Sequence, residues 1–252
     1  MTYCLGIITK DGFVAASDSR TNAGYDQVNV CRKMHLFERP GERAFVAMTS
    51  GSLSCSQSIL TLLRKDFDAG KGLAEVGTMY EAARCVGEQV RKVSDLDRKA
   101  LEQDGYRVNV HVILAGQIRG QPHDLYLIYP QGNPLRASED SPFVQIGECK
   151  YGRPILDRGV RYESTSLEEA ARYALISIDS TIRSNVTVGP PIDLLVYGRD
   201  EFRLDRRRRF ADRDPDFTAI HSQWEQALRQ AVQALPAVHF PSDESPGAPA
   251  AP

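Results

Sequence analysis

The chain has 252 residues and a net charge of −2, with 42% apolar, 8% aromatic and 25% charged residues. These proportions are typical of globular proteins and exclude a disordered, collagen-like or coiled-coil chain over most of the length. The even charge balance argues against a dedicated nucleic-acid binder, which would carry a basic excess. No apolar stretch approaches the length of about 18 residues that a membrane span needs, so we expect no membrane contact of this kind.

Cysteine and histidine usage gives no sign of a cofactor. The five cysteines are widely spaced without a C-x-x-C pair, and the five histidines lack metal-ligand spacing. No Walker or dinucleotide-binding glycine pattern is present. The first residues also lack the basic segment of a signal peptide. We therefore expect a reduced, cytoplasmic protein with no disulfide framework, no metal and no cofactor.

The N-terminal part is predicted to consist of strands. Four short apolar runs are found there, at residues 3–8, 13–16, 34–37 and 44–48. An Asp-Gly turn signal, Asp11-Gly12, joins the first two runs into a hairpin. The sequence Ser50-Gly51-Ser52 is predicted to end this series.

Helices are predicted next. The apolar residues of 59–67 mark one face of a helix that starts after Ser54 or Ser56, and apolar residues of 79–93 recur at spacings of four and three. Strands are expected again, at residues 108–114, 125–129 and 143–146.

The last third of the chain is predicted to alternate between helix and hairpin. Ser166 and Glu169 have the spacing of a capping box, which opens a helix extending to Ile182. A hairpin of 192–197 with 201–204 and a final helix over 217–235 follow.

This order of elements describes an α+β fold rather than βαβ winding. A four-layer αββα sandwich of two antiparallel sheets between helices fits the order, although the order alone does not select it. No linker or repeat divides residues 1–235, which we predict to be one domain. Residues 236–252 hold five of the 14 prolines and are predicted to be a disordered tail.

Thr2 is a candidate nucleophile. Initiator Met1 is removable when a small residue follows, and its removal would leave a chain that starts with threonine. Such a residue carries a hydroxyl and an α-amine whose pKa of about 7.7–8.0 lets it act as a base near neutral pH. A threonine activated by its own amine is a known catalytic arrangement.

Asp18 and Lys33 are candidates for tuning that nucleophile. If the first hairpin turns about Asp11, residue 18 lies opposite residue 4, and Asp18 is then diagonal to Thr2 on the same face. A two-residue turn would shift this register. Lys33 begins the next predicted strand. Its ammonium could stabilise a developing alkoxide while the carboxylate holds it in place.

These residues together resemble the pattern of a known protein family. The N-terminal threonine, the Asp18 and Lys33 positions and Ser50-Gly51-Ser52 resemble the pattern of proteasome β-type subunits. More specifically, the sequence is similar to Anbu, the ancestral β-subunit family of bacterial proteasome-type peptidases. The similarity runs to about residue 235, and its motifs lie at residues 3–7, 17–24, 32–38, 146–152 and 180–191.

The resemblance implies an N-terminal nucleophile hydrolase fold and a threonine peptidase. Thr2 would be the nucleophile, Asp18 and Lys33 would tune it, and the Gly51 N–H would belong to the oxyanion hole. Arg20 would have a supporting role. The family self-assembles, so a homo-oligomeric ring or helical turn of about twelve subunits is expected.

Two positions depart from the β-subunit pattern. Gly147-Glu148-Cys149 stands where those subunits usually have Gly-Ser-Gly, so Glu148 replaces a serine near the nucleophile's amine. In the downstream element Ser184 matches the usual serine, and Thr181 takes the place of an aspartate. Weak or narrow activity would be consistent with these changes.

Two alternatives therefore stay open. One is a non-catalytic scaffold subunit that self-assembles, and the other is an amidase that acts on a small non-peptide amide. The arginine run 206–209 is surrounded by aspartates, which favours a solvated segment or a subunit contact over a nucleic-acid or membrane site. The substrate and any unfoldase partner are not predicted.

Overall fold

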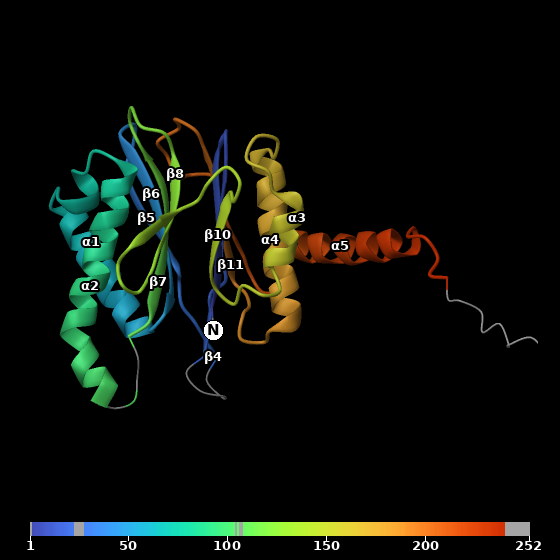
Figure 1. Cartoon of the computed structure of the whole chain (residues 1–252), viewed down its shortest axis with the longest axis horizontal. Helices are drawn as coiled ribbons and strands as arrows, with labels where there is room; N and C mark the ends of the chain where they lie inside the picture. The colour runs from blue at the N-terminus through green and yellow to red at the C-terminus, as the bar shows by residue number, and fades with distance from the viewer. Residues whose placement is uncertain (1, 23–27, 104, 106–107, 240–252) are drawn as a thin grey trace, which may run out of the picture.

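Two antiparallel sheets lie face to face between two helical layers, as the computed structural model shows for residues 2–22, 28–103, 105 and 108–239 (Figure 1). The first sheet contains, from edge to edge, β10 (Phe143–Gly147), β1 (Tyr3–Thr9), β2 (Gly12–Ser17), β11 (Ile192–Gly198) and β12 (Arg207–Phe210). The second contains β5 (Met34–Arg39), β6 (Arg43–Gly51), β7 (Val110–Ile118), β8 (Asp124–Ile128) and β9 (Pro134–Arg136). The predicted αββα sandwich is confirmed.

The helices cover the outer faces of the two sheets, and a small ribbon lies apart from both. The helices are α1 (Leu53–Asp68), the 3₁₀ turn η1 (Gly72–Ala74), α2 (Met79–Gln103), α3 (Arg153–Gly159), α4 (Leu167–Ser184) and α5 (Pro215–Gln233). Helices α1 and α2 lie against the second sheet, whereas α3 and α4 lie against the first (Figure 1). The ribbon pairs β3 (Arg20–Asn22) with β4 (Val28–Val30).

Burial on both faces explains why these strands are apolar throughout. Along β6, Phe45 and Ala47 contact the helical layer, while Val46 and Met48 face the other sheet. This alternation is the period of two that a strand imposes on its side chains. Each fully buried side chain of this size contributes about 1.5–3 kcal/mol to folding. The sandwich therefore has three apolar layers, one between the sheets and one between each sheet and its helices.

The first hairpin has a different register from the expected one. Cys4 pairs with Ser17 and Thr9 with Gly12, so the turn contains only Lys10 and Asp11, and Asp18 does not lie opposite Cys4. Gly12 explains the shift. It is the first residue of β2, with φ of 145°, and a Cβ there would lie 2.0 Å from the Tyr197 carbonyl oxygen. This close approach to β11 requires glycine inside the sheet rather than in the turn.

The final hairpin also differs from the expectation. Its second strand is β12, within the arginine run, and not residues 201–204. Asp200 and Phe202 have φ of 64° and 47°, which places them in the left-handed region and prevents a strand there. As an edge strand, β12 carries charged side chains, a feature that discourages pairing with another sheet edge.

Two further differences concern the start of one helix and the short elements. Helix α1 begins at Leu53, with Ser52 at the N-cap position, and so starts earlier than expected. The short elements β3, β4, β9 and α3 were not predicted, because each has too few residues to show a period. Of the predicted tail, residues 236–239 form no helix or strand, and 240–252 lie outside the described residues.

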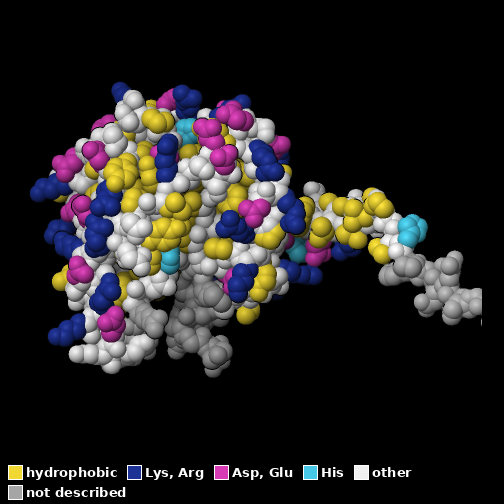
Figure 2. All heavy atoms as spheres, viewed as in Figure 1, with side chains coloured by type: hydrophobic (Ala, Val, Ile, Leu, Met, Phe, Trp, Pro, Cys, Tyr) yellow, Lys and Arg dark blue, Asp and Glu magenta, His cyan; other side chains and the backbone are white. Residues whose placement is uncertain are grey.

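Helix α5 projects from the sandwich (Figure 1), and none of its residues is buried. Apolar side chains are visible along it in Figure 2, and Leu228, Val232 and Leu235 are 51%, 61% and 67% exposed. In the described part of the chain, no helix is both long and apolar enough to cross a membrane. The same residues contain no cluster of metal-ligating side chains, and all five cysteines are free thiols.

The predicted capping box is confirmed and can be tested through stability. The Ser166 hydroxyl accepts from the Glu169 N–H, and the Glu169 carboxylate accepts from the Ser166 N–H. Ser166→Ala should lower the free energy of unfolding by about 0.5–2 kcal/mol, because an N-terminal N–H of α4 loses its acceptor. Urea denaturation measures the change. Ser58→Ala, an exposed position inside α1, is the matched control. An equal effect of both substitutions would contradict a capping contribution.

Candidate active site

A cavity of about 710 Å³ lies where several element ends meet, and it brings together three of the predicted site residues. Thr2 immediately precedes β1, Lys33 precedes β5, and Gly51 is the last residue of β6. Gly147, at the end of β10, lines the same cavity. Residues from both sheets therefore meet around the half-buried Thr2.

Asp18 and Lys33 form a buried ion pair next to this cavity. The Lys33 Nζ lies 2.6 Å from the Asp18 Oδ1, and the two side chains are 5% and 0% exposed. The same ammonium donates to the Arg20 carbonyl oxygen at 2.6 Å. Since removing one partner of such a pair leaves an uncompensated buried charge, it costs about 3–5 kcal/mol.

The Asp18 carboxylate also binds backbone on both of its oxygens. The Tyr3 N–H donates to Oδ1 at 2.9 Å, and the Gly189 N–H donates to Oδ2 at 3.2 Å. Burial raises the pKa of the Asp18 carboxyl above its ordinary value, while the Lys33 ammonium and these two N–H groups oppose the increase. Asp18 thus links Lys33 to the peptide that follows Thr2, although the predicted register is wrong.

The Thr2 carbonyl group is held from the opposite side. Its oxygen accepts from the Glu148 N–H at 2.8 Å. Gly147 has φ of 86°, and a Cβ at that position would lie 1.8 Å from the Thr2 oxygen. The approach is therefore possible only with glycine before Glu148. Backbone contacts from β2 and β10 together fix the main chain of the candidate nucleophile.

Gly51 shows a similar close approach on the second sheet. Its φ is 105°, and a Cβ there would lie 1.6 Å from the Asn109 carbonyl oxygen. That oxygen accepts from the Ser52 N–H at 3.0 Å. Only glycine can take this conformation without displacing the 109–110 backbone. The end of β6 is thereby held at the cavity wall.

Arg20 supports the ion pair indirectly. Its guanidinium donates to the Val186 carbonyl oxygen at 2.6 Å and packs on Gly189, where a Cβ would lie 2.4 Å from the Arg20 Cζ. The segment that Arg20 contacts includes the Gly189 N–H bound to Asp18. Arg20 therefore acts at both ends of this network, since its own carbonyl accepts from Lys33.

Glu148 is tied to the end of α4 by a residue that the sequence analysis did not place in the site. Glu148 is 9% exposed, and its Oε2 accepts from the Asn185 Nδ2 at 3.0 Å. The Asn185 Oδ1 accepts from the Thr187 N–H at 3.0 Å, which orients the amide. The available signal was an asparagine directly after a predicted helix, a position where side chains bond to local backbone.

Thr181 and Ser184 do not line the Thr2 cavity. The Thr181 hydroxyl is buried and donates to the Ser177 carbonyl oxygen of its own helix at 2.9 Å. Ser184 is exposed at the end of α4, and its hydroxyl forms no hydrogen bond with a described residue. Their role as supporting residues therefore stays a prediction, since Asp18, Arg20 and Glu148 are likewise not among the residues that line this cavity.

His111 and Asn109 line the cavity without having been predicted as site residues. His111 lies on β7, which the apolar alternation predicts to be a strand. It pairs with Ser50 of β6. Burial lowers the pKa of the His111 imidazole, so the ring is neutral at neutral pH. A neutral imidazole can donate or accept a hydrogen bond to a bound substrate without adding charge.

Comparisons with known proteins show which proteins the chain is similar to. No protein-family model matches the chain. The helical assembly of the Anbu complex from Pseudomonas aeruginosa is 45% identical, with a TM-score of 0.89 and coverage of 96% of this chain and 100% of that one. Anbu (ancestral beta-subunit) from Yersinia bercovieri is 41% identical, with a TM-score of 0.88 over 95% of this chain and 99% of that one.

A curated relative extends the similarity to proteasome subunits. A proteasome subunit beta from Haloferax volcanii is 29% identical over 213 residues, which are 83% of this chain and 78% of that protein. The identity to the two Anbu structures covers nearly the whole of each chain. The chain therefore belongs to the Anbu family of proteasome-type proteins and has their N-terminal nucleophile hydrolase fold.

Proposed function

We propose that the protein is a threonine peptidase whose nucleophile is the Oγ of Thr2, freed by removal of Met1. The observation that carries this proposal is the buried pair of Asp18 and Lys33, joined at 2.6 Å beside the cavity that Thr2 lines. A buried ammonium at this position has a direct chemical use, because it stabilises negative charge on the attacking oxygen.

The reaction has two steps. The Thr2 α-amine takes the proton of the hydroxyl, and the Oγ forms a bond to the carbonyl carbon of the substrate. The C–N bond then breaks, and the proton passes to the leaving amine, which leaves an acyl ester on Thr2. Water hydrolyses this ester in the second step, with the same amine as its base.

One backbone N–H and several side chains around Thr2 are proposed to assist the reaction. Gly51 is proposed to donate its N–H to the oxyanion, a contribution that is typically about 2.7–4 kcal/mol of the barrier. Asp18 holds Lys33 in place, and Arg20 positions the Gly189 segment that holds Asp18. Glu148, oriented by Asn185, is proposed to orient the α-amine of Thr2. We give no catalytic role to Thr181, whose hydroxyl is bound to the Ser177 carbonyl oxygen of its own helix, or to Ser184, which is exposed at the end of α4.

We propose further that the protein is cytoplasmic and works as a homo-oligomer. Five free thiols favour a reducing compartment. The projecting helix α5 exposes a row of apolar side chains that a second copy of the chain could cover (Figure 2). A helical assembly is described for the relative from Pseudomonas aeruginosa. We expect a ring or helical turn of about twelve subunits. Sedimentation analysis measures the mass of the assembly and so the number of subunits. A stable monomer would contradict this.

Covalent labelling tests the nucleophile. An epoxyketone or β-lactone should add its mass to the N-terminal peptide of the wild-type protein, because both groups react with a free N-terminal threonine. Intact-mass analysis should show a chain without Met1. Thr2→Ala should abolish labelling and peptide hydrolysis, whereas Thr2→Ser should keep part of both.

The same measurement separates the alternatives. Complete retention of Met1, or labelling that persists in Thr2→Ala, excludes the proposed mechanism and leaves the scaffold interpretation. Labelling of Thr2 combined with turnover of simple acyl amides but not of peptides points instead to the small-molecule amidase.

Substitution of the ion pair tests the tuning of Thr2. Lys33→Met should reduce the labelling rate at least a hundredfold, an order of magnitude that corresponds to about 3 kcal/mol of lost transition-state stabilisation. It also leaves the Asp18 carboxylate without its cation, so we expect a lower unfolding midpoint. The double variant with Asp18→Asn should recover part of the stability but none of the rate. Recovery of the rate would contradict a role of the ammonium in chemistry.

The labelling rate should depend on pH in a defined direction. It should rise as the pH increases through about 7 to 8, because the α-amine must be neutral to act as a base. Burial raises the pKa of the Asp18 carboxyl, so at lower pH its protonation removes the partner of Lys33 and the rate falls further. A rate that stays constant over this range would exclude the amine as the base.

A further inference from the structure

A groove of about 520 Å³ lies between edge strands of the two sheets. Strand β5 lines one side of it, and β12 with its neighbour β11 lines the other. Of its lining residues, Arg32 also lines the Thr2 cavity, but Thr2 itself does not line the groove. We call this space the edge groove. Its volume is within the range of about 300–1,000 Å³ that is usual for small-molecule sites.

The arginine run 206–209 sends alternate side chains to opposite faces of β12. Arg209 pairs with Asp193 in the strand ladder and Arg207 pairs with Leu195. Leu195 belongs to the apolar layer between the two sheets. Because paired residues of neighbouring strands share a face, Arg207 and Arg209 lie on the side of β12 that faces the second sheet. The edge groove opens on this side, where the apolar layer ends.

Most of the arginines in this run are neutralised within the chain. Arg208 turns to the opposite face of β12, where its guanidinium lies over the Phe210 ring, 4.5 Å from the centroid. The ion pairs are Arg206 with Glu168 and Glu201, Arg208 with Asp214 and Asp216, and Arg209 with Asp193. Arg207 is the member of the run that has no carboxylate partner among the described residues.

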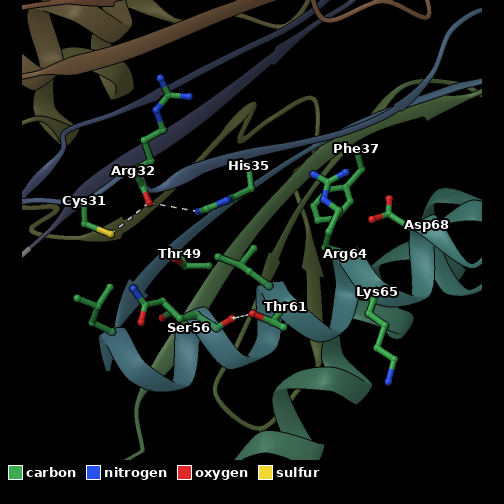
Figure 3. Close-up of a pocket in the computed structure, with 13 residues that line it drawn as sticks. Cys31, Arg32, His35, Phe37, Thr49, Ser56, Thr61, Arg64, Lys65 and Asp68 are labelled. Carbon is green, nitrogen blue, oxygen red and sulfur yellow. Dashed lines mark hydrogen bonds between the residues drawn. The ribbon is translucent and has the colours of Figure 1, made fainter.

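Two more guanidiniums reach the edge groove from the other side. In Figure 3 the Arg32 side chain points away from α1. Arg64 extends from α1 over the Phe37 ring, with its guanidinium 4.2 Å from the ring centroid. Within the described ranges of the chain, no carboxylate lies within 4.0 Å of the side-chain nitrogens of Arg32, Arg64 or Arg207.

The edge groove therefore carries an excess of positive charge. Asp193 is the carboxylate among its lining residues, and Arg209 and the Ser19 hydroxyl already bind it. Burial lowers the pKa of His35, so this residue adds no charge to the groove at neutral pH. Three guanidiniums thus remain without a counter-charge in one groove. Like charges gathered in this way repel one another, and an anion bound between them removes the repulsion.

We propose that the edge groove binds a chain of phosphates, either a free oligophosphate or the phosphate tail of a nucleotide, with Arg32 and Arg207 as its main contacts. Phosphate oxygens accept two parallel hydrogen bonds from one guanidinium. A chain of linked phosphates carries several charges and reaches arginines on both sides of the groove, whereas a single phosphate or carboxylate does not. Met34, Leu36 and Leu194 also line the groove and give a nucleotide base an apolar surface to lie on.

Isothermal titration calorimetry of the assembled, full-length protein tests this site. The probes are sodium tripolyphosphate and orthophosphate, in low salt and without divalent cations, because salt screens exposed charges. Tripolyphosphate should bind at least about tenfold more tightly than orthophosphate, since it contacts more than one guanidinium. ATP and AMP identify the source of the phosphates. Tighter binding of ATP than of tripolyphosphate indicates a nucleotide, whereas equal binding of the two indicates a free oligophosphate.

Variants of the two walls assign the binding to the groove. Arg207→Gln should weaken tripolyphosphate binding about tenfold, and the double variant with Arg32→Gln about a hundredfold, because each loses charge-assisted hydrogen bonds. Arg206→Gln is the matched control. It removes the same charge from the same run, but Arg206 pairs with Glu168 and Glu201 and does not line the groove. Thr2→Ala should bind as the wild type does, so the result is independent of the chemistry proposed at Thr2.

Three results would overturn the proposal. The first is a wild type that binds orthophosphate as well as tripolyphosphate, and the second is an equal loss of affinity in Arg206→Gln and Arg207→Gln. Both would mean that the net charge, and not this groove, attracts the anion. The third is an assembled wild type that binds no tripolyphosphate, combined with a smaller assembly for Arg207→Gln in sedimentation. The groove would then be a contact covered by a second copy of the chain.

Discussion

The site is built around one buried charge pair. An ion removed from water is stable only when protein groups replace the hydrogen bonds that water made with it. Each buried ion costs several kcal/mol in desolvation, and Coulomb attraction compensates for this only with good geometry. Asp18 meets that demand with Lys33, the Tyr3 N–H and the Gly189 N–H, and Lys33 meets it with Asp18 and the Arg20 carbonyl. The end of β2, the start of β1 and the segment before β11 are thus held together by the requirements of one carboxylate.

Backbone approach rather than side-chain packing sets the position of Thr2. Gly147 and Gly51 both have positive φ, and each lies against a carbonyl oxygen at a distance that no Cβ would tolerate. Both glycines are terminal residues of strands, where the ladder ends and the chain is free to turn. Two close contacts, one on each sheet, therefore define the cavity in which the nucleophile lies, and the apolar layers beyond them keep the strand ends rigid.

The sequence predicted the periodic features well and the long-range ones poorly. The capping box at Ser166 follows from a local pattern, whereas the αββα sandwich fits the element order and is implied by the family resemblance; both are confirmed. The expected register of the first hairpin was wrong because the constraint on Gly12 comes from Tyr197, 185 residues later in the sequence. Asn185 was missed for the same reason, since its partner Glu148 lies 37 residues earlier. Position in the chain and the family resemblance identified Thr2 and Lys33, whereas only the fold shows that they line one cavity.

One short segment, between Cys31 and His35, supplies the cation of the proposed chemistry. Between Cys31 and His35 the Lys33 side chain turns inward to Asp18, while the Arg32 guanidinium points outward (Figure 3) and its carbonyl accepts from the His35 Nε2. Lys33 places its ammonium at the cavity that Thr2 lines. A positive potential disfavours protonation of a nearby amine. The ammonium of Lys33 therefore also favours the neutral α-amine that Thr2 needs as a base.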